Sequence, residues 1–174
     1  MRIAVSGTHF VGKSTFVDLL TEALQHYKKL KEPYWQLVEE GVRFPEVLRA
    51  KDFLIQLERS LENIQNSGPD SILDRSPLDF LAYIRCCDDA RTFEYESWKE
   101  EIFRQLYRLN AIFYIPVESP DRIFCPVEAD PDLRIRMGNE LASLLFEGKW
   151  PVPIYSLTGT PEQRVSRALQ YMNK

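Results

Sequence analysis

A short apolar run, Ile3–Val5, leads into the segment Gly7–Ser14, which has the spacing G-x-x-x-x-G-K-S. An amphipathic run follows from Phe16, so a strand is expected before the motif and a helix after it. Two glycines let the backbone turn tightly enough for successive N–H groups to point at phosphate oxygens. The N-terminus of the following helix adds a positive dipole at the same place. The pattern therefore predicts a phosphate-binding loop, or P-loop.

We expect every residue of this loop to line the phosphates of a bound nucleotide: Gly7, Thr8, His9, Phe10, Val11, Gly12, Lys13, Ser14 and Thr15. In such loops the lysine reaches the β- and γ-phosphates, and the hydroxyl that follows it binds Mg²⁺. Lys13 is therefore a candidate catalytic residue and Ser14 a candidate metal ligand. The alternative is a glycine-bearing turn without a ligand, which the matching flanks on both sides disfavour. The His9 side chain is expected only to fill the loop surface toward solvent.

The chain has 174 residues, enough for one full hydrophobic core, and we expect residues 1–174 to form a single nucleotide-binding domain. Its net charge of −4 gives no overall basic field, so neither nucleic acid nor a membrane is an expected partner. No apolar run approaches the ~20 residues that a membrane span needs, and no signal-peptide pattern is present. Cys86, Cys87 and Cys125 lack C-x-x-C spacing, which favours a reducing, cytoplasmic location without cysteine-bound metal.

Strand-like and helix-like apolar patterns alternate along the chain. Strands are expected at about 3–5, 35–38, 71–73, 111–115 and 152–157, and helices at about 13–27, 45–66, 77–88, 93–109, 131–147 and 161–171. Ser76-Pro77 with Asp79, and Thr160 with Gln163, have the pattern of helix caps. This alternation predicts an α/β fold: a three-layer, doubly wound, parallel five-stranded sheet. Ligands of such sheets bind beyond the carboxyl ends of the strands.

Asp74 follows the third expected strand and so reaches this edge of the sheet. A carboxylate close to a P-loop can hold Mg²⁺ directly or through water, which makes Asp74 a candidate catalytic residue and metal ligand. The alternative is a carboxylate at a helix N-terminus that only pairs with Arg75.

Two adjacent acids, Glu39 and Glu40, close the second expected strand. A carboxylate within hydrogen-bond reach of an acceptor hydroxyl can take its proton, and adjacent strand residues point to opposite sides, so one of the two is expected in the cleft. The alternative is a solvated acidic turn. Arg43 and Arg75 are candidate acceptor-binding residues, because the guanidinium fork suits phosphate and carboxylate groups.

A segment of little periodicity, about 117–136, follows the fourth expected strand and contains Arg122, Arg134 and Arg136. An arginine that a closing lid brings over the γ-phosphate neutralises developing charge and accelerates transfer by about 10³–10⁵. We expect this lid segment to close in that way, with Arg134 as the candidate catalytic arginine. The alternative is a basic helix face without a role in chemistry.

Together these motifs resemble the P-loop small-molecule kinases: the deoxynucleoside kinases, the thymidylate-type nucleotide kinases and the ribosylnicotinamide kinase domains. The resemblance extends over the whole chain in element order. It rests on Gly7–Thr15, Glu40-Gly41-Val42-Arg43, Asp74-Arg75-Ser76-Pro77, the lid segment and Thr158-Gly159-Thr160-Pro161. The sequence looks most similar to the small AAA-like ATPases related to ribosylnicotinamide kinase, which share the E-x-x-R and D-R-S-P patterns.

The resemblance implies a P-loop NTPase fold of the nucleotide-kinase type, with ATP and Mg²⁺ as cofactors. It implies that Glu40 is the general base, that Asp74 places the magnesium and that Arg75 contacts the acceptor. It also implies that Gly159 and Thr160 lie near the adenine. The expected partners are thus a nucleoside triphosphate and a small-molecule acceptor, and a homodimer is an open alternative to a monomer.

The implied function is transfer of the γ-phosphoryl group of ATP to a nucleoside, nucleotide or similar small acceptor. The alternative is a non-kinase ATP- or GTP-binding regulatory NTPase module, because binding needs only the P-loop whereas transfer also needs Glu40, Asp74 and a lid arginine. A GTPase switch is disfavoured, because Asp74 is followed by Arg-Ser-Pro and the chain has no N-K-x-D motif. A hexameric AAA machine would need a further helical subdomain, for which the chain leaves no room.

Overall fold

The computed structural model describes residues 1–173, apart from the side chain of Thr92. At its centre is a five-stranded parallel sheet with the strand order β2-β3-β1-β4-β5. The strands are β1 (Arg2–Ser6), β2 (Lys28–Leu30), β3 (Ser71–Asp74), β4 (Ala111–Tyr114) and β5 (Ile154–Ser156). The predicted α/β fold with a parallel five-stranded sheet is confirmed.

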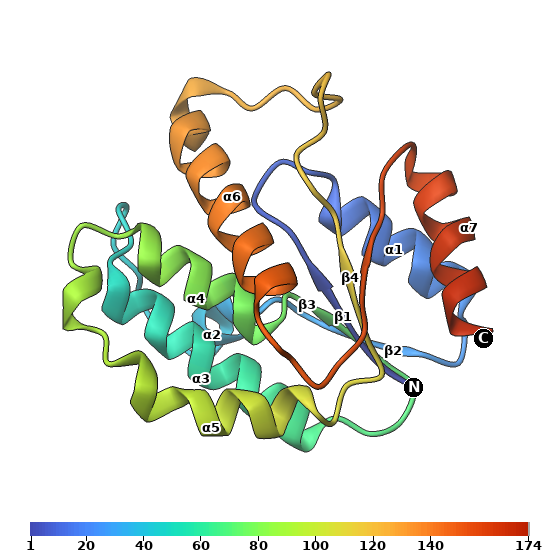
Figure 1. The fold of residues 1–174 in the computed structure, drawn as a ribbon, viewed down its shortest axis with the longest axis horizontal. Helices are drawn as coiled ribbons and strands as arrows, with labels where there is room; N and C mark the ends of the chain where they lie inside the picture. The colour runs from blue at the N-terminus through green and yellow to red at the C-terminus, as the bar shows by residue number, and fades with distance from the viewer. Residues whose placement is uncertain (174) are drawn as a thin grey trace.

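Helices cover both faces of the sheet, which gives the three layers seen in Figure 1. On one face lie α1 (Lys13–Ala23) and α7 (Pro161–Met172), and on the other α3 (Ala50–Asn66), α4 (Pro77–Cys86), α5 (Tyr95–Leu106) and α6 (Pro131–Glu147). The short helix α2 (Pro33–Glu39) packs on α3, and the 3₁₀ turns η1 (Ala90–Thr92) and η2 (Val127–Ala129) lie in connections. Among the described residues, no helix is long and apolar enough to cross a membrane.

Alternate residues of the central strands enter two different hydrophobic cores. In β1, Ile3 and Val5 pack with α1 and α7, whereas Ala4 packs with the opposite helical layer. In β4, Phe113 packs with α1 and α7, whereas Ile112 packs with the opposite helical layer. Parallel strands that are buried on both faces require continuous apolar runs, which is why these strands are recognisable in the sequence.

The predicted second strand at 35–38 is wrong, because this segment belongs to α2. Pro33 occupies the start of that helix, where its fixed φ favours helix and its missing N–H costs no hydrogen bond. The second strand is β2, an edge strand that pairs only with β3 and exposes Lys28 and Lys29. Lysines protect an edge strand from pairing with other chains, so a polar sequence is compatible with a strand there. The acid that follows the second strand is consequently Glu32 and not Glu40.

The predicted helix caps are confirmed. Ser76 and Asp79 form a capping box at the start of α4, and Thr160 and Gln163 form one at the start of α7. Two helices are shorter than their apolar periodicity suggests, since α1 stops before the predicted end at 27 and α3 starts after the predicted start at 45.

The five strands run in the same direction, so the segments that follow them meet at one edge of the sheet. These segments are the loop Gly7–Gly12 after β1, Glu32 after β2, Arg75 after β3, the lid segment after β4 and residues 157–160 after β5. The P-loop, Asp74-Arg75, the lid segment and the Thr158–Pro161 motif therefore lie at or near this edge, whereas the Glu40–Arg43 motif lies beyond α2.

Candidate functional site

The loop from Gly7 to Gly12 connects β1 to the N-terminus of α1, as the motif predicts. Gly12 is the N-cap of α1 and has a left-handed backbone with φ of 83°, which glycine adopts at little cost. A Cβ atom on Gly7 would lie 2.7 Å from the carbonyl oxygen of Ile115, so a larger residue does not fit beside the end of β4. Phe10 also has positive φ, at 51°. Both glycines of the motif are thus required by the local geometry.

Lys13 begins α1 and has a buried side chain, whereas the neighbouring Ser14 and Thr15 are exposed. Burial and the positive charge of Arg75 lower the pKa of Lys13, while nearby carboxylates, led by Asp74, oppose this change. The loop therefore offers a buried ammonium group and accessible hydroxyl groups beside the positive end of a helix.

Asp74 is the last residue of β3 and lies opposite Val5 of β1, close to the start of the loop. It is 7% exposed, and its Oδ1 atom is buried without a hydrogen-bond partner in the described structure. Burial raises the pKa of this carboxyl group, and Lys13 acts in the opposite direction. Buried polar atoms are nearly always paired, so this oxygen is suited to a cation or to a water on a cation.

A magnesium ion at Asp74 would take most of its ligands from phosphate oxygens and water. Residues 1–173 contain no group of three or more His, Cys, Asp or Glu side chains that could hold a metal by itself. Mg²⁺ keeps several waters and is commonly bound through one or two protein ligands together with substrate phosphates. The predicted ligands Ser14 and Asp74 fit that requirement.

Asp79 is fully buried and joins the loop to the segment after β3. Its Oδ1 atom accepts hydrogen bonds from the Gly7 N–H at 2.9 Å and from the Arg75 guanidinium at 3.4 Å. Its Oδ2 atom accepts from the N–H and hydroxyl groups of Ser76 at 3.1 and 3.0 Å. One carboxylate thus fixes the first glycine of the loop relative to the arginine. From the sequence, Asp79 is predicted only as part of a helix cap. Its position shortly after Asp74-Arg75 is the sequence feature that could have indicated a place in the site.

Arg75 is buried beside the loop and forms an ion pair with Glu32, whose side chain is 20% exposed. Arg75 has a left-handed backbone with φ of 81°. Its Nε donates to Glu32 Oε1, and its Nη1 donates to the carbonyl oxygen of Gly7 at 3.1 Å. The guanidinium carbon lies over the Tyr83 ring, 5.3 Å from its centre. Burial acts to raise the pKa of Glu32, but Arg75 and Lys13 outweigh it and hold that pKa below its usual value. Glu32 is therefore ionised at neutral pH.

Glu40 lies at the other end of α2 from Glu32. It is the exposed C-cap residue, and its two carboxylate oxygens accept hydrogen bonds from Arg59 at 2.5 and 2.6 Å. The hydrogen bond from Arg59 lowers the pKa of Glu40. The structure thus corrects the expectation that Glu40 follows the second strand. Arg43 is exposed in the connection between α2 and α3, whereas Arg75 is buried next to the loop.

Arg134 of α6 contacts the backbone of the loop. Its Nε donates to the His9 carbonyl oxygen at 3.2 Å, and its Nη2 donates to the Phe10 carbonyl oxygen at 2.8 Å. Both terminal nitrogens also bind the carboxylate of Asp121 in the lid segment, Nη2 at 3.0 Å. The N–H and C=O groups of a peptide point in opposite directions, so an arginine on the carbonyl side lies away from the N–H groups that are predicted to bind phosphate. In this conformation Arg134 connects the lid segment to the outer side of the loop.

The His9 side chain makes a second connection between the loop and its surroundings. Its Nδ1 lies 3.2 Å from the Tyr83 hydroxyl oxygen, and its Nε2 lies 3.3 Å from the carbonyl oxygen of Asp130, the N-cap of α6. Burial lowers the pKa of His9, so the imidazole is neutral at neutral pH. The expectation that His9 only faces solvent is wrong.

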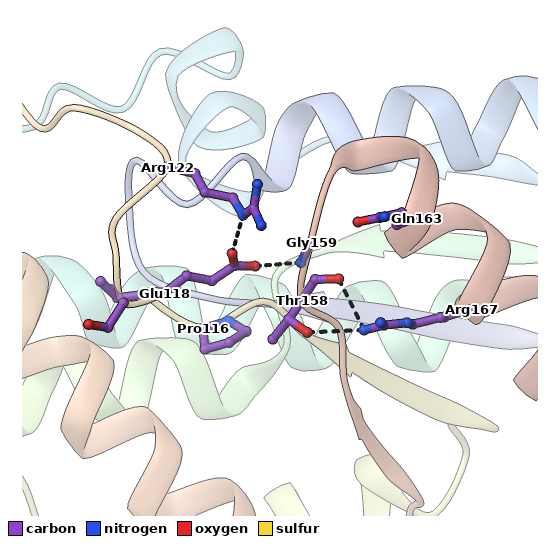
Figure 2. Close-up of a pocket in the computed structure, with 9 residues that line it drawn as sticks. Pro116, Glu118, Arg122, Thr158, Gly159, Gln163 and Arg167 are labelled. Atoms are coloured by element: carbon purple, nitrogen blue, oxygen red, sulfur yellow. Dashed lines mark hydrogen bonds and ion pairs between the residues drawn. The ribbon is translucent and has the colours of Figure 1, made fainter.

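A cavity of about 480 Å³ lies between the segment after β4 and the segment after β5 (Figure 2). Its walls include Glu118, Arg122, Gly159 and Arg167. The Glu118 carboxylate lies between two of these groups, because Oε1 accepts from the Gly159 N–H at 2.6 Å and Oε2 pairs with Arg122. Of the two residues predicted to lie near a nucleobase, Gly159 lines this cavity and Thr160 follows it as the N-cap of α7.

Arg164 of α7 connects this cavity to the P-loop. Its Nη1 donates to the carbonyl oxygen of Val11 at 2.8 Å, and its Nη2 donates to Glu118 Oε1 at 3.1 Å. Arg164 is not among the predicted site residues, because an arginine on an amphipathic helix is ordinarily assigned to the solvent face. The available signal is that it lies one turn before the buried Ala168, on the core side of α7, whereas Arg167 does not.

No protein-family model matches the chain, and no curated protein matches it. Solved structures do match, and they include kinases of nucleosides, nucleotides and other small molecules. The chain therefore has the P-loop NTPase fold of the nucleotide-kinase type, and the predicted resemblance in fold is confirmed.

Three of these structures illustrate the similarity. Deoxyadenosine kinase from M. mycoides, with bound dATP, is 15% identical with a TM-score of 0.64 and 100% of both chains covered. Thymidylate kinase from Candida albicans is 17% identical with a TM-score of 0.65, over 99% of this chain and 90% of that one. The NadR protein in complex with NR is 16% identical with a TM-score of 0.72, over 99% of this chain and 50% of that one. At these identities the similarity establishes the fold alone.

Proposed function

We propose that this protein is a phosphotransferase that binds ATP and moves its γ-phosphoryl group to a small acceptor. The proposal rests on two features that lie beside the P-loop at the same sheet edge. One is a buried Asp74 oxygen without a described hydrogen-bond partner, and the other is the ion pair between Glu32 and the buried Arg75. A P-loop is sufficient for nucleotide binding, whereas a metal-placing acid and an acceptor-side carboxylate are what transfer needs. The fold shared with small-molecule kinases supports the same conclusion.

On the donor side, backbone N–H groups between Gly7 and Thr15 would bind the phosphates, and the Lys13 ammonium would bind the β- and γ-phosphates. The exposed hydroxyl of Ser14 and the buried Oδ1 of Asp74 would hold Mg²⁺. Magnesium, when bound, neutralises charge on the β- and γ-phosphates. Asp79 would keep the first glycine of the loop in place during this process.

On the acceptor side, we assign the role of proton acceptor to Glu32 in place of Glu40. Glu32 follows β2 and is held in its ionised form by Arg75, whereas Glu40 is paired with Arg59 at the opposite end of α2. An ionised carboxylate beside the P-loop can take the proton of an acceptor hydroxyl as transfer proceeds. Arg75 acts by positioning this carboxylate.

We assign the nucleobase to the cavity lined by Gly159, and the lid function to Arg122. The Arg122 side chain is 53% exposed and forms an ion pair with Glu118. Because it is exposed, it can leave this ion pair and turn toward bound phosphates. Arg134 is 4% exposed and is bound to Asp121 and to two loop carbonyl groups. We therefore propose Arg134 as a support of the loop. The choice of ATP over GTP, the cytoplasmic location and the oligomeric state stay predictions of the sequence.

The first test is ATP binding by Lys13→Ala. Loss of a charged hydrogen-bond donor to phosphate is expected to weaken binding by roughly 10- to 100-fold, measured by isothermal titration with a non-hydrolysable ATP analogue. Lys51→Ala, at an exposed position of α3, is the matched control and is expected to bind like the wild type. Full affinity in Lys13→Ala would contradict the assignment of the phosphate site.

The second test is turnover, measured as ADP formation with Mg²⁺–ATP and a panel of nucleosides, nucleotides and small alcohols. A compound that raises ADP formation above hydrolysis by water supports a phosphotransferase. If ATP binds and no compound in the panel raises turnover, the proposed activity is wrong and a nucleotide-binding regulatory module becomes the better description.

A further inference from the structure

The cluster beside the P-loop contains more carboxylates than buried cations. Among its described residues the acids are Glu32, Asp74 and Asp79, and the buried cations with which they interact electrostatically are Lys13 and Arg75. Lys29 of β2 also acts on Asp74, but it is exposed and paired with Asp18. In the proposed function Lys13 binds the phosphates of the nucleotide. Arg75 is then the cation of this cluster that remains on the acceptor side.

Arg75 already has partners on several sides. Its Nε is bound to Glu32, and its Nη1 is bound to the Gly7 carbonyl oxygen at 3.1 Å and to Asp79 at 3.4 Å. The Tyr83 ring covers a face of the guanidinium, and the side chain is 8% exposed. An arginine that binds a phosphate presents two parallel N–H donors to it. Here the Nε and Nη1 atoms already donate hydrogen bonds to Glu32, Asp79 and the Gly7 carbonyl group.

Two further cations near this cluster are paired as well. Arg59 of α3 binds both carboxylate oxygens of Glu40 at 2.5 and 2.6 Å. Lys31, which directly precedes Glu32, forms an ion pair with Glu39. A negatively charged acceptor that bound Arg59 or Lys31 would have to displace the carboxylate already paired with it, and it would approach an ionised Glu32 at the same time.

From this charge distribution we infer that the acceptor is an uncharged alcohol, such as a hydroxyl group of a nucleoside or sugar, and not a phosphate ester. The inference rests on the proposed phosphotransferase function and specifies the acceptor class of that same site. A phosphate monoester is mostly a dianion at neutral pH, so its attacking oxygen has no proton for Glu32 to take. A hydroxyl group has such a proton and adds no negative charge.

The transfer step follows from this assignment. The acceptor hydroxyl oxygen forms a bond to the γ-phosphorus, and the bond between that phosphorus and the β–γ bridging oxygen breaks. The electron pair of the broken bond leaves with ADP. The hydroxyl proton passes to the Glu32 carboxylate and from there to water. The products are ADP and the phosphate monoester of the alcohol.

The experiment compares alcohols with their own 5′-monophosphates as acceptors for the wild-type protein, with Mg²⁺–ATP as donor. The matched pairs are adenosine, deoxycytidine, thymidine, ribosylnicotinamide and ribose with the corresponding 5′-phosphates. We expect ADP formation to rise with one or more of the alcohols and not with their phosphates. A rise with phosphates alone would overturn the alcohol acceptor and leave the phosphotransferase function standing. No rise with either class, at saturating ATP, would count against the proposed function and remove the basis of the inference.

Glu32→Gln tests the proton-accepting group. It is expected to lower acceptor-dependent turnover by about 10²–10⁴, mainly in kcat. Glu40→Gln makes the same chemical change at the other end of α2 and is expected to leave turnover unchanged. Because Glu32 also pairs with Arg75, ATP affinity and melting temperature are measured on the same samples, and Glu32→Asp provides a second variant that keeps the charge. Wild-type turnover in a folded Glu32→Gln protein would overturn the role of Glu32.

Discussion

Two buried aspartates within the segment 74–79 differ in whether their carboxylate oxygens have hydrogen-bond partners. Asp74 has an oxygen without a described partner, and burial raises its pKa. Asp79 has both oxygens satisfied by Gly7, Arg75 and Ser76. A group kept available for a ligand commonly costs stability, whereas a fully satisfied buried group stabilises the fold. Replacement by Asn is therefore expected to raise the free energy of unfolding at Asp74 and to lower it at Asp79.

Asp74→Asn is expected to raise the free energy of unfolding of the nucleotide-free protein at neutral pH. A pKa that is raised in the folded state means that ionisation of Asp74 disfavours folding above that pKa, and an amide avoids this cost. The wild type recovers stability as the pH falls through the raised pKa of folded Asp74 toward the lower pKa that Asp74 has in the unfolded state. The advantage of the variant is therefore largest at neutral pH and shrinks below it. Urea titrations across this range measure the effect, and a variant less stable than the wild type at neutral pH would contradict the prediction.

Asp79→Asn is expected to lower the free energy of unfolding by roughly 1–3 kcal/mol. An amide has a single acceptor oxygen, so it cannot accept from both Gly7 and Ser76. Asp88→Asn, at an exposed position after α4, is the control and is expected to change stability by less than about 0.5 kcal/mol. Urea titration at neutral pH measures both variants. Equal stability of Asp79→Asn and the wild type would show that this carboxylate does not organise the site.

At the scale of the elements, the connection between the lid segment and the P-loop distinguishes this site from an isolated nucleotide-binding loop. Arg134 binds the outer carbonyl groups of the loop together with Asp121. His9 lies within hydrogen-bond distance of the start of α6. The lid segment and the P-loop are therefore joined through side chains of both.

Arg134→Lys is expected to increase amide hydrogen exchange in residues 8–12 and 118–130 and to leave α3 and α4 unchanged. A lysine keeps the charge but has a single nitrogen, so it cannot bind Asp121 and two carbonyl groups at once. Arg136→Lys, at an exposed position of the same helix, is the matched control. Unchanged exchange together with a loss of turnover of about 10³ or more would instead identify Arg134 as the catalytic lid arginine that the sequence predicts.

Elements with a strong local pattern could be predicted from the sequence. The apolar runs of β1, β3 and β4 and the capping boxes of α4 and α7 are of this kind. β2 could not be found, because an edge strand buries little and its Lys28-Lys29 sequence is typical of a surface segment. The apolar residues that follow Pro33 belong to a short helix, and a short apolar run does not by itself distinguish helix from strand.

The same division applies to the candidate site. The P-loop, Asp74 and Arg75 belong to continuous motifs next to recognisable strands, so their positions could be predicted. Glu32 could not, because its position depends on which segment is the second strand. Arg164 could not, because it interacts with the loop only once α7 has packed on α1. Side chains that join distant segments leave little trace in local sequence patterns.

For the molecule as a whole, the strand order places segments from all parts of the chain at one sheet edge. With β1 between β3 and β4, the P-loop lies between the segment that contains Asp74 and Arg75 and the segment that contains Glu118 and Arg122. The proposed acceptor site is on the first side and the cavity assigned to the nucleobase is on the second. The two sides are separate in sequence, but Asp79 and Arg75 connect the first side directly to Gly7 of the P-loop.

The hydrogen bond from Arg164 to the Val11 carbonyl group spans 153 residues of sequence. During synthesis the P-loop emerges from the ribosome at the beginning, whereas the arginine that supports it emerges near the end. A nascent chain therefore contains the complete nucleotide motif long before it contains the finished site. The P-loop therefore acquires its contact with Arg164 only when α7 has been made.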